Sequence, residues 1–277
     1  MSAADVPARE LMAEELTLTG RITTASNATF LGAIGDTPVV YKPVVGEAPL
    51  WDFPAETLAR REVAAHLVSE ALGWDIVPHT WLRDGPFGEG MVQLWQEQDP
   101  EQDAVDLFPA DQVPASGWLT ILEGEDEDGN RLVLAHEDSA ALRRMAVFDV
   151  IVNNADRKGD HILAMADGHR FGVDHGLTFH HEDKLRTVLW GWAGKPVDDE
   201  TLADIEKLIK KKINVEAIEL PDARRFRERD PRRDVAGREE VQRSASMPST
   251  RPMRGARPVR SAPADPFFDK PYEASDA

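Results

Sequence analysis

The chain has 277 residues, a length that suits one large two-lobed domain or two small ones. It contains no cysteine, which excludes disulfides, thiolate nucleophiles and cysteine-based zinc sites. Its formal net charge of −18 argues against nonspecific nucleic-acid binding, because an acidic body repels phosphate backbones.

The charge and hydropathy of the sequence indicate in which cellular compartment the protein is expected. The first fifteen residues carry charged side chains and no apolar core, so we expect no secretory signal. No apolar stretch approaches the roughly 20 residues that a membrane-spanning helix needs. We therefore expect a cytoplasmic protein without a transmembrane segment, and the lack of cysteine suits a reducing compartment.

The first half of the chain is rich in strand-like segments. Turn residues bound three short apolar segments, which predicts an antiparallel meander over residues 16–24, 28–35 and 38–45. A helical apolar stripe follows, with Gly73 as its stop. Its members are Ala64, Leu67, Val68, Ala71 and Leu72. Two more strands are predicted over residues 77–84 and 90–96.

The second half is predicted to be mostly helical, with one hairpin. Helices are expected over residues 103–119, 138–154 and 197–212, and hairpin strands lie near HILAM and FGVD. These elements predict an α+β protein of two lobes. The N-lobe, residues 16–98, holds an antiparallel sheet and one helix, and the mostly helical C-lobe spans residues 99–220.

Residues 221–277 have the composition of a tail. They are rich in Arg, Ser and Pro and carry a net charge of +3, from 13 Lys/Arg and 10 Asp/Glu, whereas residues 1–220 carry −21. Such a segment has too few apolar side chains to offset the entropy of ordering it, so we expect it to be disordered. It is a candidate docking segment for a protein partner.

The hairpin region places three candidate catalytic residues together. If its strands pair, Asp174 returns close to Asp156 and His161. One carboxylate there can hold Mg²⁺ against a polyphosphate, and the other can accept a proton from an attacking hydroxyl. Asp156 and Asp160 can equally cap turns while Asp174 simply ends a strand.

A lysine far upstream favours the chemical interpretation. Strand alternation puts Lys42 on one face with Val40 and Val44, and an inward ammonium needs an anionic partner. Glu62, which lies off the predicted apolar stripe of the next helix, is the candidate. An exposed lysine on an edge strand remains the alternative.

These residues, in this order, resemble a known group. A strand lysine, a helix glutamate, NNADRKGDHIL and VDHG are similar to the atypical kinases of the phosphatidylinositol 3-/4-kinase superfamily, especially type II phosphatidylinositol 4-kinases and HipA-type kinases. More narrowly, the chain resembles an actinobacterial group of phosphatidylinositol-kinase-like proteins. The resemblance covers about residues 18–215 and implies a two-lobed, atypical protein-kinase-like fold that binds ATP with Mg²⁺ or Mn²⁺.

The resemblance also implies a role for each matched position. Lys42 would bind the α- and β-phosphates of ATP, steadied by Glu62. Asp156 would be the catalytic aspartate, and Asp174 the principal metal ligand. Four further positions would contact the nucleotide: Ser26 and Asn27 at the phosphates, and Gln93 and Trp95 near adenine.

One position departs from the family pattern. The superfamily usually has Asn five residues after the catalytic aspartate, and this chain has His161. Because Mg²⁺ prefers oxygen ligands, three outcomes are open: a softer ion such as Mn²⁺, an oxygen supplied by Asp160, or a degraded site.

The expected function is therefore an ATP-dependent phosphotransferase that moves the γ-phosphate to a hydroxyl of an unidentified lipid, protein or small molecule. The first alternative is a catalytically silent nucleotide-binding pseudokinase or scaffold. The second alternative is a metal-dependent hydrolase, whose metal ligands would be histidines and an aspartate. The candidate ligands are His161, Asp174, His175, His180 and His181.

Overall fold

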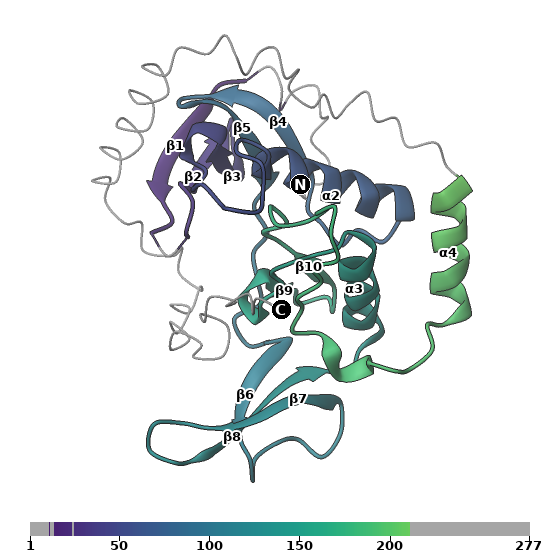
Figure 1. The fold of residues 1–277 in the computed structure, drawn as a ribbon. Coiled ribbons are helices and arrows are strands. Elements are labelled where there is room, and N and C mark those ends of the chain that lie inside the picture. Colours follow the sequence, from purple (N-terminus) through teal and green to yellow (C-terminus); the bar gives the residue numbers. More distant parts are fainter. Residues whose placement is uncertain (1–10, 12–13, 24, 211–277) are drawn as a thin grey trace, which may run out of the picture.

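The computed structural model describes residue 11 and residues 14–23 and 25–210, and these form two lobes (Figure 1). The first lobe holds a five-stranded sheet in the order β1-β2-β3-β5-β4, with every neighbouring pair antiparallel. Its strands are β1 (Leu16–Arg21), β2 (Phe30–Ile34), β3 (Thr37–Pro43), β4 (Thr80–Gly85) and β5 (Gly88–Leu94). All five strands expected from the sequence are confirmed.

Helix α2 (Leu58–Leu72) packs with this sheet in the described part of the lobe and connects β3 to β4. It ends at Gly73, whose φ of 73° is the left-handed conformation that glycine adopts without steric cost. The expected helix is thus confirmed, but of the expected apolar stripe only Leu72 is buried, with Val68 partly buried against the same core. The buried residues of α2 are Leu58, Ala59, Glu62, Ala65, His66, Ser69 and Leu72.

The second lobe contains a three-stranded antiparallel sheet in the order β6-β8-β7. Its strands are β6 (Val105–Pro109), β7 (Trp118–Glu125) and β8 (Arg131–Glu137). The helix expected over residues 103–119 is therefore wrong. Pro109 and Pro114 lack the amide proton that a helix needs, and Gly117 has a φ of 78°, so this segment forms β6 and the start of β7, the two strands that flank β8.

Helix α3 (Ala140–Ile151) follows the sheet, and Ser139 caps its first turn by accepting a hydrogen bond from the amide of Leu142 at 3.1 Å. The short 3₁₀ segment η3 (Gly159–His161) leads into the expected hairpin of β9 (Ile162–Ala164) and β10 (Arg170–Gly172). A second 3₁₀ segment, η4 (Trp190–Trp192), and helix α4 (Asp199–Lys210) complete the described chain.

The main apolar core lies between α2 and α3. Leu142, Met145 and Phe148 of α3 are fully buried and cluster with Ala65 and Leu72 of α2. Burial of apolar surface is the dominant stabilising term, so this cluster fixes the two lobes against each other. A separate cluster, built around Phe30, Tyr41 and Val92, covers the sheet of the first lobe.

The structure confirms the α+β class and the antiparallel sheet with one helix in the first lobe. The second lobe contains more strand than expected, because its added sheet replaces a predicted helix. The predicted tail over residues 221–277, and the last ten residues of the predicted C-lobe, lie outside the described residues. Among the described residues, no helix is both long and apolar enough to cross a membrane.

Candidate active site

Lys42, in the centre of the site, is held by two carboxylates from distant parts of the chain. Its Nζ lies 2.6 Å from Oε1 of Glu62 on α2 and 2.8 Å from Oδ1 of Asp174, which follows β10. Burial by itself lowers the pKa of this ammonium, but the charges of Asp174 and Glu62 outweigh burial and raise the pKa above its ordinary value. Lys42 is therefore a fixed positive charge.

Glu62 links the two lobes, because one of its oxygens binds a partner in the first lobe and the other binds a partner in the second. Oε1 accepts from Lys42, and Oε2 accepts a 2.8 Å hydrogen bond from the backbone amide of His175. The side chain is 2% exposed, so its charge depends on these two partners. The expectation that Glu62 would lie off the packing face of the helix is wrong, because the buried face of α2 is centred on Glu62 itself.

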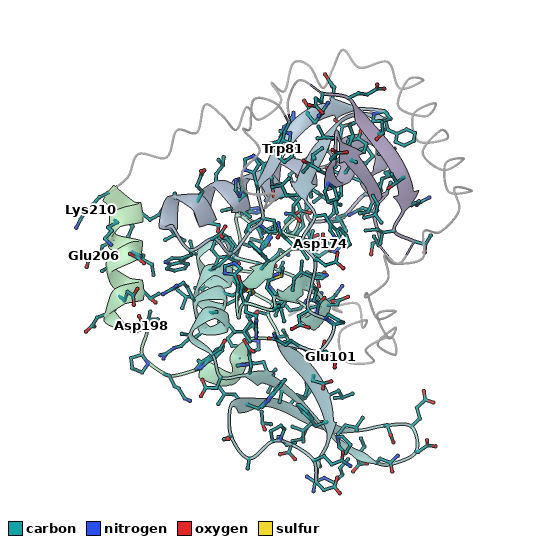
Figure 2. The ribbon with its side chains drawn as sticks, turned by 180° about the vertical axis from the view of Figure 1, so that it is seen from behind. Trp81, Glu101, Asp174, Asp198, Glu206 and Lys210 are labelled. Carbon is teal, nitrogen blue, oxygen red and sulfur yellow. The ribbon has the colours of Figure 1, made fainter. Side chains whose placement is uncertain are left out.

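Asp174 is the most accessible of these three groups, with 49% of its side chain exposed. Figure 2 shows it between the sheet of the first lobe and the elements of the second. Its φ of 59° turns the chain sharply after β10. The charge of Lys42 lowers the pKa of Asp174 well below its usual range.

His161 and Asp160 complete the accessible edge of the site. The Nε2 atom of His161 lies 3.4 Å from Oδ2 of Asp174 and 3.8 Å from Oδ1 of Asp160. Its Nδ1 atom is buried and has no hydrogen-bond partner among the described residues. Two carboxylates thus converge on one imidazole nitrogen.

Asp156 lies in the loop between α3 and η3. Its backbone amide donates a 3.0 Å hydrogen bond to Oδ1 of Asn154, which fixes the turn. Its carboxylate pairs with the Arg186 guanidinium and lies 3.1 Å from Nζ of Lys158. The structure therefore orients Asp156 by two cations and leaves its side chain partly exposed.

A buried ion pair that the sequence analysis missed supports this loop. Asp149 and Arg157 are both 0% exposed, and Nη2 of Arg157 lies 2.9 Å from Oδ1 of Asp149. Arg157 also donates to the carbonyl oxygens of His161 and Val173 at 3.2 Å, and its Nη2 lies 2.6 Å from Nε2 of His175. One guanidinium thus ties the end of α3 to the segments that carry His161 and Asp174.

Neighbouring groups complete the buried network. Asp149 accepts further hydrogen bonds from Asn154 and Thr187, each at 2.9 Å. Burial, reinforced by the charge of Arg157, lowers the pKa of His175, so this imidazole is neutral at ordinary pH. A signal was present in the sequence: AVFDVIV places an Asp inside an apolar helix, and a buried carboxylate needs a cation such as Arg157.

The four residues expected to contact the nucleotide lie apart from the Lys42 cluster. Ser26 is exposed, and the Asn27 side chain accepts a 2.7 Å hydrogen bond from the amide of Ala48, so Asn27 organises the chain after β3. Gln93 is buried and donates to the hydroxyl of Thr80 at 2.8 Å. The indole of Trp95 donates to Glu97. The structure does not join these side chains to the Lys42 cluster.

The histidines of the alternative hydrolase site are divided. His180, His181 and Glu182 lie close enough to share an ion. However, Nε2 of His180 lies 2.9 Å from the Asp52 carbonyl, and its Nδ1 accepts from the Glu182 amide at 3.0 Å. Both ring nitrogens of His180 are therefore occupied by the backbone, which argues against a metal site there.

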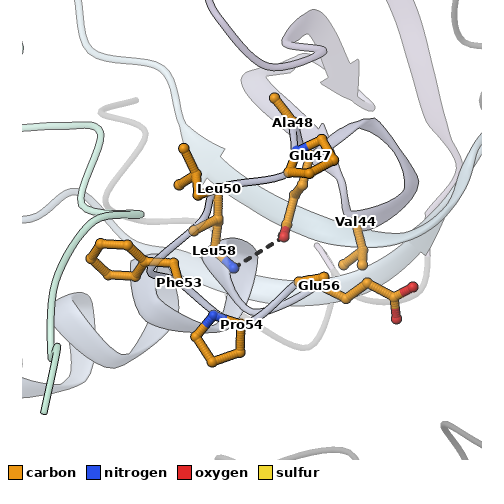
Figure 3. A pocket seen from close by; sticks show the side chains of 10 residues that line it. Val44, Glu47, Ala48, Leu50, Phe53, Pro54, Glu56 and Leu58 are labelled. Carbon is orange, nitrogen blue, oxygen red and sulfur yellow. Dashed lines mark hydrogen bonds between the residues drawn. The ribbon is translucent and has the colours of Figure 1, made fainter. Parts of the chain in front are cut away.

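A small pocket lies beside the start of α2, between Val44 and Leu58 (Figure 3). Glu47 caps the helix there: its carboxylate accepts from the amides of Leu58 at 3.2 Å and Ala59 at 2.9 Å. Burial raises the pKa of Glu47 above its ordinary value. The pocket is formed by this capping loop. The loop fixes the start of α2, the helix that carries Glu62.

Comparison with known proteins assigns the chain to a family. Over 207 residues it is 57% identical to protein Rv2133c of Mycobacterium tuberculosis strain H37Rv, in an alignment that covers 70% of this chain and 74% of the relative. The chain belongs to the family of Rv2133c. No protein-family model matches it.

The fold of this Rv2133c-family chain was also compared with solved structures. It overlaps the proinflammatory kinase CtkA of Helicobacter pylori with a TM-score of 0.41 and 10% sequence identity, over 86% of this chain and 93% of CtkA. With a TM-score below 0.5, this likeness does not by itself define the fold.

Proposed function

We propose that this member of the Rv2133c family is an ATP-dependent phosphotransferase that transfers the γ-phosphate to a hydroxyl of a lipid, a protein or a small molecule. The observation that carries the proposal is the pairing of Lys42 with both Glu62 and Asp174. Phosphoryl transfer depends on positioning and on neutralising phosphate charge, and a kinase uses a strand lysine held by a helix glutamate for this purpose.

The charges of the site suit a nucleotide. Glu62 is buried and also bound to the His175 amide, so it stays with Lys42, whereas Asp174 is half exposed and free to exchange its partner. An incoming phosphate can take the place of Asp174 at Lys42 and keep the ammonium neutralised. Lys42 and Glu62 would then hold the phosphates from the side of the first lobe.

The same residues fit a divalent cation. Asp174 and Asp160 present carboxylate oxygens within 4 Å of one imidazole nitrogen, and Mg²⁺ binds through one or two carboxylates and phosphate oxygens. Asp174, with Asp160 or His161, would hold Mg²⁺ or Mn²⁺, which supplies charge neutralisation at the phosphates. The histidine of a metal site usually donates its second N–H to an acceptor, and Nδ1 of His161 has none among the described residues, which favours Asp160 as the second ligand.

Asp156 would accept the proton of the acceptor hydroxyl. Its carboxylate is oriented by Arg186 and Lys158, and its backbone is fixed by Asn154. A hydroxyl that approaches Asp156 has to replace one of these cations, of which Lys158 is the more weakly held at 3.1 Å. The resemblance to lipid kinases makes phosphatidylinositol the first acceptor to test.

Two measurements test the proposal. In a thermal-shift assay, ATP at about 100 times its dissociation constant, with Mg²⁺ or Mn²⁺, should add roughly 2.7 kcal/mol of stability. Turnover of γ-labelled ATP should then be followed with no added acceptor, with phosphatidylinositol vesicles and with free inositol. Asp156→Asn should abolish transfer and retain the thermal shift, whereas Asp167→Asn, in the exposed turn between β9 and β10, should leave both unchanged.

The alternative is a pseudokinase that binds nucleotide without transferring phosphate. The feature that favours it is His161, which stands where the superfamily has an oxygen ligand. A thermal shift without any Asp156-dependent transfer would support this alternative. Absence of stabilisation by every nucleotide and metal pair would reject both functions.

A further inference from the structure

The added sheet of the second lobe has a row of leucines that crosses all three strands. Leu134 on β8 lies directly opposite Leu107 on β6 and Leu122 on β7. Residues directly opposite in an antiparallel register share one face of the sheet, so these three leucines form a continuous row, here called the leucine row. Leu107 and Leu122 are 48% and 43% exposed.

The leucine row continues inward to the candidate active site. The next residues on the same face, Val105, His136 and Leu119, again lie opposite one another. His136 packs against the Trp192 ring at 4.3 Å, and a side chain added at Gly159 would meet Val105 at 3.2 Å. The apolar face thus runs from η3, next to His161, to the exposed end of the sheet, which projects away from the rest of the second lobe (Figure 1).

The surroundings of the leucine row are strongly acidic. Residues 101–138 contain 11 Asp or Glu and a single basic residue, Arg131. The acids within the strands, such as Glu123 and Glu125, lie on the opposite face. The turn between β7 and β8, at the exposed end of the sheet, carries Asp126, Glu127 and Asp128, and the last two are exposed. An apolar row that ends at an acidic turn suits a partner that is both apolar and basic, because a purely apolar partner would leave the acids unmatched and a purely basic one would leave the leucines exposed.

One segment of the same chain has this composition. Residues 241–260 contain five arginines and no acidic residue, and they interleave these arginines with Met247, Met253 and Val259. This segment lies outside the described residues, and it begins 31 residues after Lys210. A chain of that length spans up to on the order of 100 Å, so the segment is able to reach any face of its own molecule.

We propose that residues 241–260 dock on the leucine row of their own chain. Their apolar side chains cover Leu107, Leu134 and Leu122, and their arginines face the acidic turn between β7 and β8. Tethering raises the local concentration of the segment to about the millimolar range, so that modest contacts suffice. The docked segment then lies on the face that leads to η3. This interaction does not depend on the proposed phosphotransferase activity.

The absence of cysteine makes the test direct. Full-length Ala256→Cys is labelled with a benzophenone maleimide and irradiated without nucleotide, and the cross-linked peptides are mapped by mass spectrometry. We expect most intrachain cross-links to fall within residues 105–137. Salt at 0.5 M should lower their yield at least threefold, because it screens charges beyond a few ångströms.

Two sets of surface variants separate the apolar and charged contributions. Leu107→Ser with Leu122→Ser, and separately Glu127→Lys with Asp128→Lys, should each lower the yield at least threefold. Leu202→Ser on α4 is the matched control, since Leu202 is 45% exposed and far from the leucine row in sequence, and it should leave the yield unchanged. Thermal melts verify that each variant is folded.

Three results would overturn the proposal. Cross-links spread evenly over the surface, or concentrated outside residues 105–137, would show that the leucine row is not the docking site. Cross-links formed between chains, seen as dimers whose yield rises with protein concentration, would show that the occupant comes from another copy. A yield insensitive to salt would remove the charge complementarity on which the assignment rests.

Discussion

Lys42 and Asp174 are 132 positions apart in the chain, yet their side chains meet at 2.8 Å. The same Lys42 ammonium lies 2.6 Å from Glu62, so one cation is shared between the helix of the first lobe and the turn after β10. Because only Asp174 is half exposed, it is the partner that a phosphate group can replace. This asymmetry is the basis of the proposed function.

Removal of Lys42 tests its structural contribution. Lys42→Met leaves the carboxylate of Glu62 buried without its cation, so we expect the free energy of unfolding to fall by about 2–4 kcal/mol in urea denaturation. The control is Arg131→Met, which removes an ion pair to Glu123 that is more than half exposed and should cost less than about 1 kcal/mol. Equal costs for the two variants would contradict the view that Glu62 depends on Lys42.

Two aspartates seven positions apart should behave in opposite ways. Asp149→Asn leaves the buried Arg157 guanidinium without a counter-charge, and we expect a loss of stability of about 3–5 kcal/mol. Asp156→Asn affects a partly exposed carboxylate, so its cost should stay below about 1 kcal/mol while phosphoryl transfer is lost. Urea denaturation and ATP turnover should be measured on both variants. If Asp156→Asn lost stability and Asp149→Asn lost only transfer, the roles given to the two aspartates would be refuted.

The metal preference of the protein tests whether His161 or Asp160 is the second metal ligand. If His161 ligates the ion, His161→Asn replaces nitrogen with the oxygen that Mg²⁺ prefers, so activity should move from Mn²⁺ towards Mg²⁺. If Asp160 is the second ligand instead, Asp160→Asn should weaken the metal dependence more than His161→Asn does. We expect the second result, because Nδ1 of His161 has no acceptor among the described residues. A larger effect of His161→Asn would return the histidine to the metal site.

A buried histidine pair should make stability depend on pH. Nδ1 of His66 lies 3.2 Å from the Val77 carbonyl, which only accepts, so His66 holds its proton on Nδ1. Its Nε2 therefore accepts from Nδ1 of His79 at 3.1 Å, and both rings are neutral. Burial lowers the pKa of both His66 and His79 below the ordinary value. The unfolded chain then binds more protons than the folded one below about pH 6.5, and stability falls on acidification.

The matched variant is His79→Asn, whose amide donates from nearly the same position but does not titrate. We expect the melting temperature of this variant to fall less between pH 7.5 and 5.5 than that of the wild type. Part of the dependence should persist, because burial also lowers the pKa of His136 and of His175. His181→Asn, at an exposed position, is the control. The same slope in His79→Asn and wild type would remove the pair as a source of pH sensitivity.

The order of chemical groups along the sequence predicts which residues lie together in the candidate site. A lysine among valines and a hairpin flanked by Asp156 and Asp174 each suggest function only weakly, but together they narrowed the possibilities, and the structure joins Lys42, Glu62, Asp174 and His161. The burial of Glu62 was not predicted, because the packing face of α2 mixes polar with apolar residues. That face carries Glu62, His66 and Ser69, whose polar groups are satisfied by partners far away in the sequence.

The added sheet and the Asp149–Arg157 pair were missed for different reasons. The apolar residues between positions 103 and 119 suggest a helix, but the prolines that end β6 and precede β7 exclude one. Asp149 was treated as part of an apolar helix, although a carboxylate between Phe148 and Val150 requires a buried partner. The partner becomes evident only when the loop folds back on α3.

The most direct test is to locate a bound metal ion. A crystal of the full chain with Mn²⁺ and a non-hydrolysable ATP analogue, measured at a wavelength where manganese scatters anomalously, shows the ion without reference to any assumed role. We expect an anomalous peak at about 2.2 Å from the carboxylate of Asp174, with Lys42 released to the phosphates and still paired with Glu62. A peak at His180, His181 and Glu182, or an Asp174 still paired with Lys42 beside a bound nucleotide, would contradict the proposed site.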